Sequence, residues 1–442
     1  MVRGAGAPIT MADAPQRIAF VAMDFQRPGD DEFGLAGNGR GFPFQMSGGY
    51  AHTDLYHTIV GLQQMGHEVH LFAITRSAMW RRSPFEPERL PFPATSVPLD
   101  EPPDAVPPLR ARVREAVDSW QPGIVFAGFL GYHKPHVLEA LARYPLINRQ
   151  YFHEALCILT PYRYKEFQIC PNDVLRTPNV CRACALRWWG PQIRAAEPAL
   201  YAKELLDVGA LKPTYHRLHT STLAQCRSTV VYNEGIQREL EAYCSDMHVI
   251  PMGVDLNEFI QTPLAEKSKG KRTIIFMPSM AGDPHNGVHV LAKAGHVLAQ
   301  HRADFEIRVI APEDHVRQPW FTAYDQQDRA SVLRLYEEAD IVAAPPVWGD
   351  PMGYAAIEGM AAGRPIVASR AGVFPELVGE EETGLLFTLE SSDELRRCLE
   401  RLMDNPALRA RMGDQARRAA ANHDWDHIIK THYPPLLERA VS

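Results

Sequence analysis

The sequence predicts an α/β fold of two domains, each with a parallel sheet covered by helices. Short apolar runs alternate with amphipathic stretches in both halves of the chain, which is the pattern of repeated βαβ units. A polar stretch at 257–271 separates the halves. The length of 442 residues also favours two domains. Because open parallel sheets bind ligands at the carboxyl ends of their strands, the domains are expected to face each other across a ligand-binding cleft.

The first half begins with a strand and a glycine-rich loop. Arg17–Met23 is an apolar run typical of a buried parallel strand. A glycine-rich segment follows, and the apolar periodicity of the next stretch predicts a helix that stops at Gly66. Residues 67–73, directly after Gly66, are predicted to form the second strand and complete a right-handed βαβ unit. Further strands are predicted at 123–127, 146–152 and 228–232.

The second half restarts the same alternation. Strands are predicted at 273–277, 305–310, 341–344 and 365–369, with helices at 287–298 and 332–339 and one last helical stretch over 393–420. Residues from about 153 to 190 read as an insert in the first domain. We therefore place a loose tail at 1–16, the first domain at 17–255, a linker at 256–272, the second domain at 273–415 and a closing helix at 416–442 that returns to the first domain.

Composition and charge argue against several classes of protein. The formal net charge is −7 at pH 7, so the basic face that a nucleic-acid backbone demands is not expected. No stretch approaches the ~20 apolar residues of a transmembrane helix. The first sixteen residues lack the plan of a signal peptide, and seven cysteines without such a signal predict no disulfide framework. We therefore expect a cytoplasmic protein.

The most informative segment of the sequence carries two acidic residues eight positions apart, Asp350 and Glu358. Between them, Gly353 and Tyr354 can start a helix whose amino end offers free N–H groups and a positive dipole to a diphosphate. Glu358, further along that helix, could accept hydrogen bonds from ribose hydroxyls. The alternative is a capped surface helix with ordinary acidic residues, and spacing alone leaves both interpretations open.

This segment resembles the E-x7-E region of the retaining GT-B glycosyltransferases of family four, with Asp350 in place of the first glutamate. Further motifs of the family match in the same order over nearly the whole chain. No single motif identifies the family, but the whole set at these separations is specific for it. The other matching segments are 48–49, 65–69, 250–259, 335–340, 372–378 and 383–386. The resemblance implies the GT-B fold, in which two Rossmann-like α/β domains face each other across a cleft.

The resemblance also implies roles for particular residues. Glu358 would hold the donor ribose, and Asp350 would lie at the hydroxyls of the transferred sugar. His153 would contact that sugar near its reacting face, although a satisfied loop histidine is the alternative. The remaining donor-binding groups would be backbone amides, those of Gly48 and Gly49 at the diphosphate and those of Met352, Gly353 and Tyr354 near the sugar.

The sequence departs from the family at the start of the second domain. Gly282 and Asn286 stand where the family carries an Arg and a Lys that neutralise the donor phosphates. Without these two cations, the negative charge on the leaving diphosphate is less well stabilised. We expect Ser279, His285 or a residue of another loop to compensate, and we count Asn286 with Ser279 and His285 among the donor-binding residues. Without compensation the donor or the activity would be unusual. The family's front-face mechanism needs no protein nucleophile and no catalytic metal, because the leaving diphosphate accepts the acceptor's proton.

A second distinctive feature is a group of cysteines in the insert. Cys181 and Cys184 form a C-x-x-C pair, and two upstream thiols, Cys157 and Cys170, could complete a four-thiolate site. The group resembles a cysteine insert found in a subset of the family. We predict a structural zinc ion, with an iron–sulfur cluster as the minority option and buried free thiols as the alternative.

The function predicted from these observations is transfer of a sugar from a nucleotide diphosphate-sugar, with UDP or GDP as the favoured nucleotide. A small-molecule acceptor, as in natural-product tailoring, and a glycan acceptor both remain open. A sugar-nucleotide epimerase of the same architecture and a nucleotide-binding protein with weak catalysis are the alternatives. An NAD-dependent oxidoreductase is disfavoured because Gly-x-Gly-x-x-Gly is absent directly after Met23.

Overall fold

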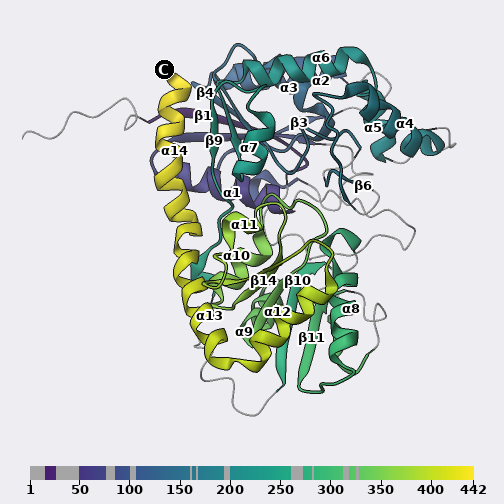
Figure 1. Cartoon of the computed structure of the whole chain (residues 1–442). Coiled ribbons are helices and arrows are strands. Elements are labelled where there is room, and N and C mark those ends of the chain that lie inside the picture. The colour runs from purple at the N-terminus through teal and green to yellow at the C-terminus, as the bar shows by residue number, and fades with distance from the viewer. Residues whose placement is uncertain are drawn as a thin grey trace, which may run out of the picture.

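The computed structural model contains two α/β domains, one above the other in Figure 1. The structure describes residues 15–25, 49–75, 85–99, 106–159, 162–165, 168–193, 200–259, 272–280, 283–311, 318–324 and 328–442. The predicted tail at 1–16 lies almost entirely outside these residues, as do most of the predicted linker and both Gly48 and Gly282.

The first domain is built on a parallel sheet with the strand order β3-β2-β1-β4-β5-β8-β9. Buried, continuous apolar runs make its central strands, as expected where helices cover both faces of a sheet. The strands are β1 (Arg17–Met23), β2 (Glu68–Thr75), β3 (Ala94–Pro98), β4 (Ile124–Ala127), β5 (Leu146–Arg149), β8 (Ser228–Val231) and β9 (Met247–Val249).

Helices cover both faces of this sheet and extend into the insert. They are α1 (Gly49–Gln64), α2 (Val106–Trp120), α3 (Lys134–Ala140), α4 (Pro178–Ile193), α5 (Leu200–Asp207), α6 (Pro213–Gln225) and α7 (Glu234–Leu240). The insert also contains a short antiparallel hairpin of β6 (Tyr164–Lys165) and β7 (Gln168–Ile169).

The second domain repeats the plan with the parallel strand order β12-β11-β10-β13-β14-β15. The strands are β10 (Thr273–Met280), β11 (Phe305–Ile310), β12 (Phe321–Tyr324), β13 (Ile341–Ala344), β14 (Ile366–Ser369) and β15 (Gly384–Phe387). The helices are α8 (Val288–Leu298), α9 (Arg329–Glu338), α10 (Tyr354–Ala361), α11 (Phe374–Leu377), α12 (Ser392–Asp404) and α13 (Pro406–Ala420).

The predicted helical stretch over 393–420 is helical in the structure but divided at Asn405 into two helices, α12 and α13. Pro406 opens α13, and the Asn405 side chain caps it by accepting a hydrogen bond from the Leu408 amide at 2.9 Å. An Asn-Pro pair therefore ends one helix and starts the next. The Asn-Pro pair is a short local signal. It was missed because the apolar periodicity continues from one helix into the next.

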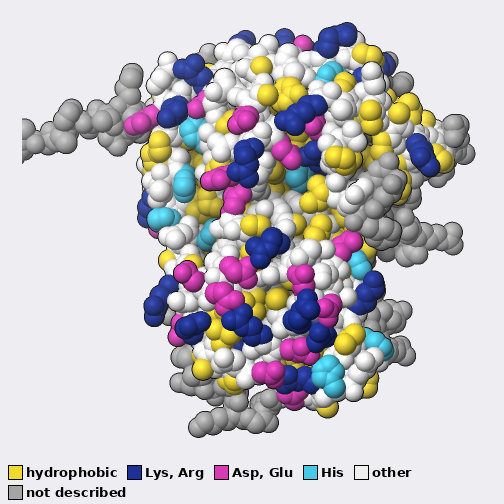
Figure 2. All heavy atoms as spheres, in the orientation of Figure 1, with side chains coloured by type: hydrophobic (Ala, Val, Ile, Leu, Met, Phe, Trp, Pro, Cys, Tyr) yellow, Lys and Arg dark blue, Asp and Glu magenta, His cyan; other side chains and the backbone are white. Residues whose placement is uncertain are grey.

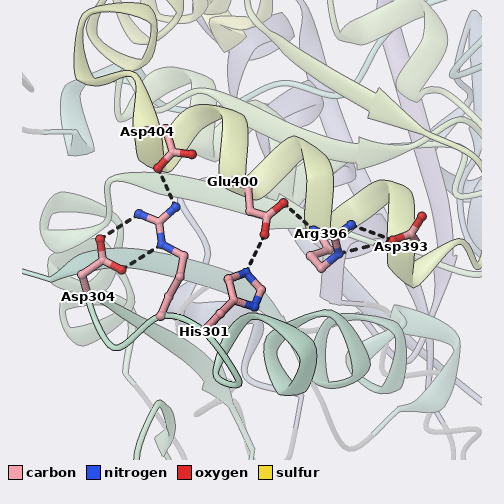
Figure 3. A network of polar contacts seen from close by, with 7 residues as sticks. His301, Asp304, Asp393, Arg396, Glu400 and Asp404 are labelled. Carbon is pink, nitrogen blue, oxygen red and sulfur yellow. Dashed lines mark hydrogen bonds and ion pairs between the residues drawn. The ribbon is translucent and has the colours of Figure 1, made fainter.

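Charged side chains fix α12 against the loop that follows α8. Arg302 binds Asp304 and Asp404, and His301 binds Glu400, which also pairs with Arg396 (Figure 3). Several of these groups are exposed, so each pair contributes well under about 1 kcal/mol on its own. Figure 2 shows acidic and basic side chains intermixed on the visible face.

The last helix, α14 (Trp425–Val441), leaves the second domain and packs on the first (Figure 1). Its apolar side chains, Ile428, Ile429 and Tyr433 among them, share one core cluster with Ile18 and Phe20 of β1. The Tyr433 hydroxyl lies 2.9 Å from the Thr58 hydroxyl of α1. Among the described residues, no helix is long and apolar enough to span a membrane.

Candidate functional site

The segment before α10 forms a tight loop around Asp350. One carboxylate oxygen of Asp350 accepts hydrogen bonds from the amides of Met352, at 2.9 Å, and Gly353, at 3.2 Å. Burial raises the pKa of this carboxyl group, and the two amides oppose the rise. Gly353 has φ +63°, a left-handed conformation that favours glycine, and a Cβ there would lie 2.7 Å from Val373. The Met352 and Gly353 amides, predicted to face the sugar, donate to Asp350 in this structure.

Glu358 lies on α10, one turn after its start, and is only 4% exposed. Its carboxylate accepts a hydrogen bond from the Tyr336 hydroxyl at 2.8 Å and pairs with Arg329. Arg329 also binds Glu258, in the segment that connects the first domain to the second. A carboxylate has about four acceptor sites, so Glu358 keeps capacity for ribose hydroxyls while these partners hold it in place.

The amino ends of α1 and α10 lie close together, although the two helices belong to different domains. Gly49 is the first residue of α1, and the ring of Tyr50 lies 4.7 Å from the ring of Tyr354, the first residue of α10. The first amides of a helix have no partner within the helix, and its amino end carries a partial positive charge. Two such ends at one place form a site suited to a diphosphate. Gly48, which was predicted to contribute here, lies outside the described residues.

His153 follows β5 and reaches across to the second domain. Its Nε2 donates a hydrogen bond to the Gly349 carbonyl at 2.9 Å, and burial lowers the pKa of the imidazole to about 4. The side chain of the neighbouring Glu154 is 8% exposed, pairs with Lys134 and accepts from the Tyr151 amide at 2.9 Å. This pair fixes the turn that carries His153. The Gly349 carbonyl that His153 contacts directly precedes Asp350, the residue at the first glutamate position of the motif.

The end of β10 and the 3₁₀ turn that follows it contain three of the predicted donor-binding residues. Ser279 is half-buried near the end of β10, and His285 and Asn286 lie on a single 3₁₀ turn, Pro284–Asn286. His285 Nδ1 lies 2.8 Å from an oxygen of Asp283.

An aromatic side chain of the insert covers this 3₁₀ turn. The Tyr162 hydroxyl donates to the other oxygen of Asp283 at 2.5 Å, and the Tyr162 ring stacks on His285 at 4.3 Å. A neighbouring insert residue, Tyr164, binds Glu390 of the second domain. Beside Asn286, one of the two positions where the resemblance implies a cation, this chain therefore has an Asp283–His285 pair covered by tyrosines.

The four insert cysteines, Cys157, Cys170, Cys181 and Cys184, are all half-buried and unoxidised. Cys181 lies one helical turn before Cys184 on α4 and 3.8 Å from the Thr177 hydroxyl. Burial raises the pKa of its thiol, and the nearby Cys170 and Cys184 add to the rise. Among the residues that the structure describes, no group of three or more His, Cys, Asp or Glu side chains is arranged to hold a metal ion. The zinc site stays a prediction.

The structure brings most of the predicted donor-site residues to the junction of the two domains. Gly49, His153, Asp350, Tyr354 and Glu358 all lie around the converging ends of α1 and α10. Sequence reasoning missed Arg329 as the partner of Glu358. Its signal was weak, because Asp328 before it reads only as a helix cap.

The fold and these converging helix ends define a two-domain protein of the GT-B type. Residues 312–419 match the family model described as "Glycosyl transferases group 1". A phosphatidyl-myo-inositol mannosyltransferase of Mycolicibacterium smegmatis is 28% identical over 202 residues, which are 43% of this chain and 51% of that protein. An MMP alpha-(1->4)-mannosyltransferase of Mycolicibacterium hassiacum is 32% identical over 214 residues, 44% of this chain and 49% of that protein. The chain thus spans about half the length of the curated relatives it matches.

Solved structures match over nearly the whole chain. Sucrose-phosphate synthase from Thermosynechococcus elongatus has a TM-score of 0.62 at 17% identity, covering 96% of this chain and 98% of that one. Anabaena HepE in complex with UDP has a TM-score of 0.63 at 16% identity, covering 96% of this chain and 100% of that one. These likenesses confirm the predicted fold of two parallel-sheet α/β domains.

Proposed function

We propose that this protein is a glycosyltransferase that moves a sugar from a nucleotide diphosphate-sugar to a small-molecule or glycan acceptor. The observation that carries the proposal is the meeting of the amino ends of α1 and α10 at the domain junction, 4.7 Å apart at the rings of Tyr50 and Tyr354. Two helix dipoles favour the diphosphate there, and the buried Glu358 supplies an acceptor for the ribose.

The comparisons support a nucleotide-sugar donor. Two relatives are named as mannosyltransferases, and a structural neighbour was solved with UDP. UDP and GDP are the proposed nucleotides. The epimerase alternative gains no support from these likenesses. A nucleotide-binding protein with weak catalysis remains the second candidate, favoured by Asn286 standing where the family carries a cation.

The proposed reaction retains the anomeric configuration of the sugar. The acceptor hydroxyl attacks the front face of the anomeric carbon, the bond to the phosphate breaks, and the leaving diphosphate accepts the hydroxyl proton. The protein contributes positioning and charge stabilisation. The helix ends stabilise the departing diphosphate. Asp350 and the neutral His153 position the sugar ring.

Thermal unfolding with UDP, GDP, ADP, TDP and NAD tests the donor site. A ligand at 100 times its Kd stabilises the native state by about 2.7 kcal/mol. One nucleoside diphosphate should raise the Tm of the wild type and raise it less for Glu358→Gln. The control Glu400→Gln lies on α12, in the network of Figure 3, and should respond like the wild type. A response to NAD alone would refute the proposal.

Product analysis separates the two candidates and tests retention. The proposed enzyme transfers or hydrolyses the sugar of the nucleotide that binds, and NMR of the product should show the donor's anomeric configuration. Binding without any turnover would favour the weak-catalysis alternative, and an inverted product would exclude the front-face mechanism.

A further inference from the structure

Two buried ring nitrogens at the domain junction have no hydrogen-bond partner. They are Nδ1 of His153 and Nε1 of Trp348, in side chains that are 7% and 4% exposed. The two rings lie 6.1 Å apart in a T-shaped arrangement. Buried polar groups normally have partners, so these two nitrogens beside the proposed sugar site can take theirs from a ligand.

The hydrogen-bonding character of each nitrogen is defined. Because His153 Nε2 donates to the Gly349 carbonyl, the neutral imidazole carries its proton there and Nδ1 presents a lone pair. Burial lowers the pKa of this histidine to about 4, so the neutral form holds at neutral pH. The indole Nε1 of Trp348 can only donate. The pair therefore offers one acceptor and one donor.

Aromatic neighbours hold the indole in place. The ring of Tyr162 packs edge-on against Trp348 at 4.6 Å, and the ring of Phe152 lies 6.4 Å away. Together with His153, these rings come from the first domain and its insert, whereas Trp348 belongs to the second. A ring packed on several sides cannot turn to find another partner for its N–H group.

We propose that Trp348 is a specificity-determining residue that reads one hydroxyl of the transferred sugar. The indole N–H donates to that hydroxyl oxygen, and the hydroxyl donates its proton to His153 Nδ1. This inference rests on the proposed function. A hydroxyl both accepts and donates, which matches the pair. An ionised phosphate only accepts, so it leaves the lone pair of His153 unsatisfied and repelled.

The substitution Trp348→Phe tests the proposal because it removes the N–H and keeps an aromatic ring. The measurement is the Kd for a free nucleotide and for its sugar conjugate, UDP with UDP-glucose and GDP with GDP-mannose, using whichever pair binds the wild type. We expect Trp348→Phe to weaken binding of the sugar nucleotide about 3- to 10-fold, the loss of one neutral hydrogen bond. Binding of the free nucleotide should be unchanged.

Two controls make the result specific. Trp320→Phe makes the same substitution in the second domain, where Trp320 packs over Gly295, and should change neither Kd. Monodeoxy analogues of the sugar nucleotide complete a double-mutant cycle. The wild type should bind one analogue more weakly than the parent sugar nucleotide. For Trp348→Phe the difference between that analogue and the parent should be smaller, because only the hydrogen bond from the hydroxyl to His153 remains to be lost.

The outcomes separate this inference from the proposed function. If Trp348→Phe binds the sugar nucleotide as tightly as the wild type, or loses the same factor for the free nucleotide, the inference is wrong while the proposed function stands. If the wild type binds neither the free nucleotide nor its sugar conjugate, both the inference and the proposed function are wrong. Thermal unfolding of Trp348→Phe without ligand shows that the variant is folded.

Discussion

Removal of one partner from the buried Asp54–Arg149 ion pair should destabilise the first domain strongly. Arg149, at the end of β5, is fully buried, and Asp54 on α1 is 1% exposed. Their contacts are bidentate, at 2.8 Å and 3.2 Å, and the Tyr151 hydroxyl donates to the same carboxylate at 3.1 Å. Asp54→Leu leaves the guanidinium with the Ile250 carbonyl and the face of the Tyr232 ring.

The structure sets the expected magnitude. Breaking a buried pair by removing one partner costs about 3 to 5 kcal/mol, against about 5 to 15 kcal/mol for the stability of a whole protein. Asp54→Leu and Arg149→Met should each cost that much. The double variant replaces the pair by apolar side chains of similar size and should recover most of the loss. The coupling free energy between the two substitutions is therefore expected to be at least about 3 kcal/mol.

Urea unfolding of the wild type, the two single variants and the double variant measures this coupling. Two domains can unfold in separate transitions. The unfolding of the first domain is therefore measured separately from that of the second, by calorimetry and fluorescence together. The reasoning is refuted if either single variant stays within about 1 kcal/mol of the wild type. It is equally refuted if the double variant is as unstable as the sum of the singles, since the partners would then be independent.

Three further predictions concern pH, a glycine and the insert. The pKa values of His153 and His219 are lowered to about 4 by burial. The unfolded chain therefore binds more protons between pH 4 and about 6.5, and stability is complete above that window and falls by about 1.4 kcal/mol per pH unit for each histidine as the pH drops through it. Urea titrations at pH 7, 6 and 5 should show the summed slope of these histidines and of His52 and His57, whose pKa values are also lowered to about 4. His219→Gln should reduce the slope by about 1.4 kcal/mol per pH unit, and an equal slope in the variant would contradict the assignment. Gly287→Ala should cost about 2 to 4 kcal/mol in thermal unfolding, because φ is +80° and the new Cβ would lie 1.8 Å from the Pro345 carbonyl oxygen; a stable variant would contradict this backbone geometry. If the insert holds zinc, metal analysis of the purified protein should find one ion per chain and Cys181→Ser should lose it, whereas metal-free wild type would leave four free thiols.

Much of the fold could be predicted because strands buried between helices read as continuous apolar runs. Arg17–Met23 and 305–310 were predicted with the bounds that the structure shows. The break at Asn405 was missed because α12 and α13 share one apolar periodicity. Their separation depends on a single Asn-Pro pair.

The candidate site was harder to predict, because its side chains meet through contacts between distant segments. The Asp350–Glu358 spacing located α10, but nothing local indicated that Arg329 would hold Glu358. The stacking of Tyr162 on His285 joins two residues that belong to different domains and lie 123 positions apart in the sequence. Sequence patterns report periodicity and caps, and the partner of a buried charge is set by the assembled fold.

The return of α14 to the first domain has a consequence for how the protein is made. The chain passes between the domains twice, and the passages lie side by side, since the Val254 amide donates to the His423 carbonyl at 2.7 Å and the Trp425 amide to the Val254 carbonyl at 3.2 Å. The core beneath β1 includes Ile428 and Tyr433, which a ribosome adds only after the second domain. Domains usually fold in order of synthesis. Here the first domain to emerge completes its core last, so it leaves the ribosome with an open hydrophobic face that only the end of this same chain closes.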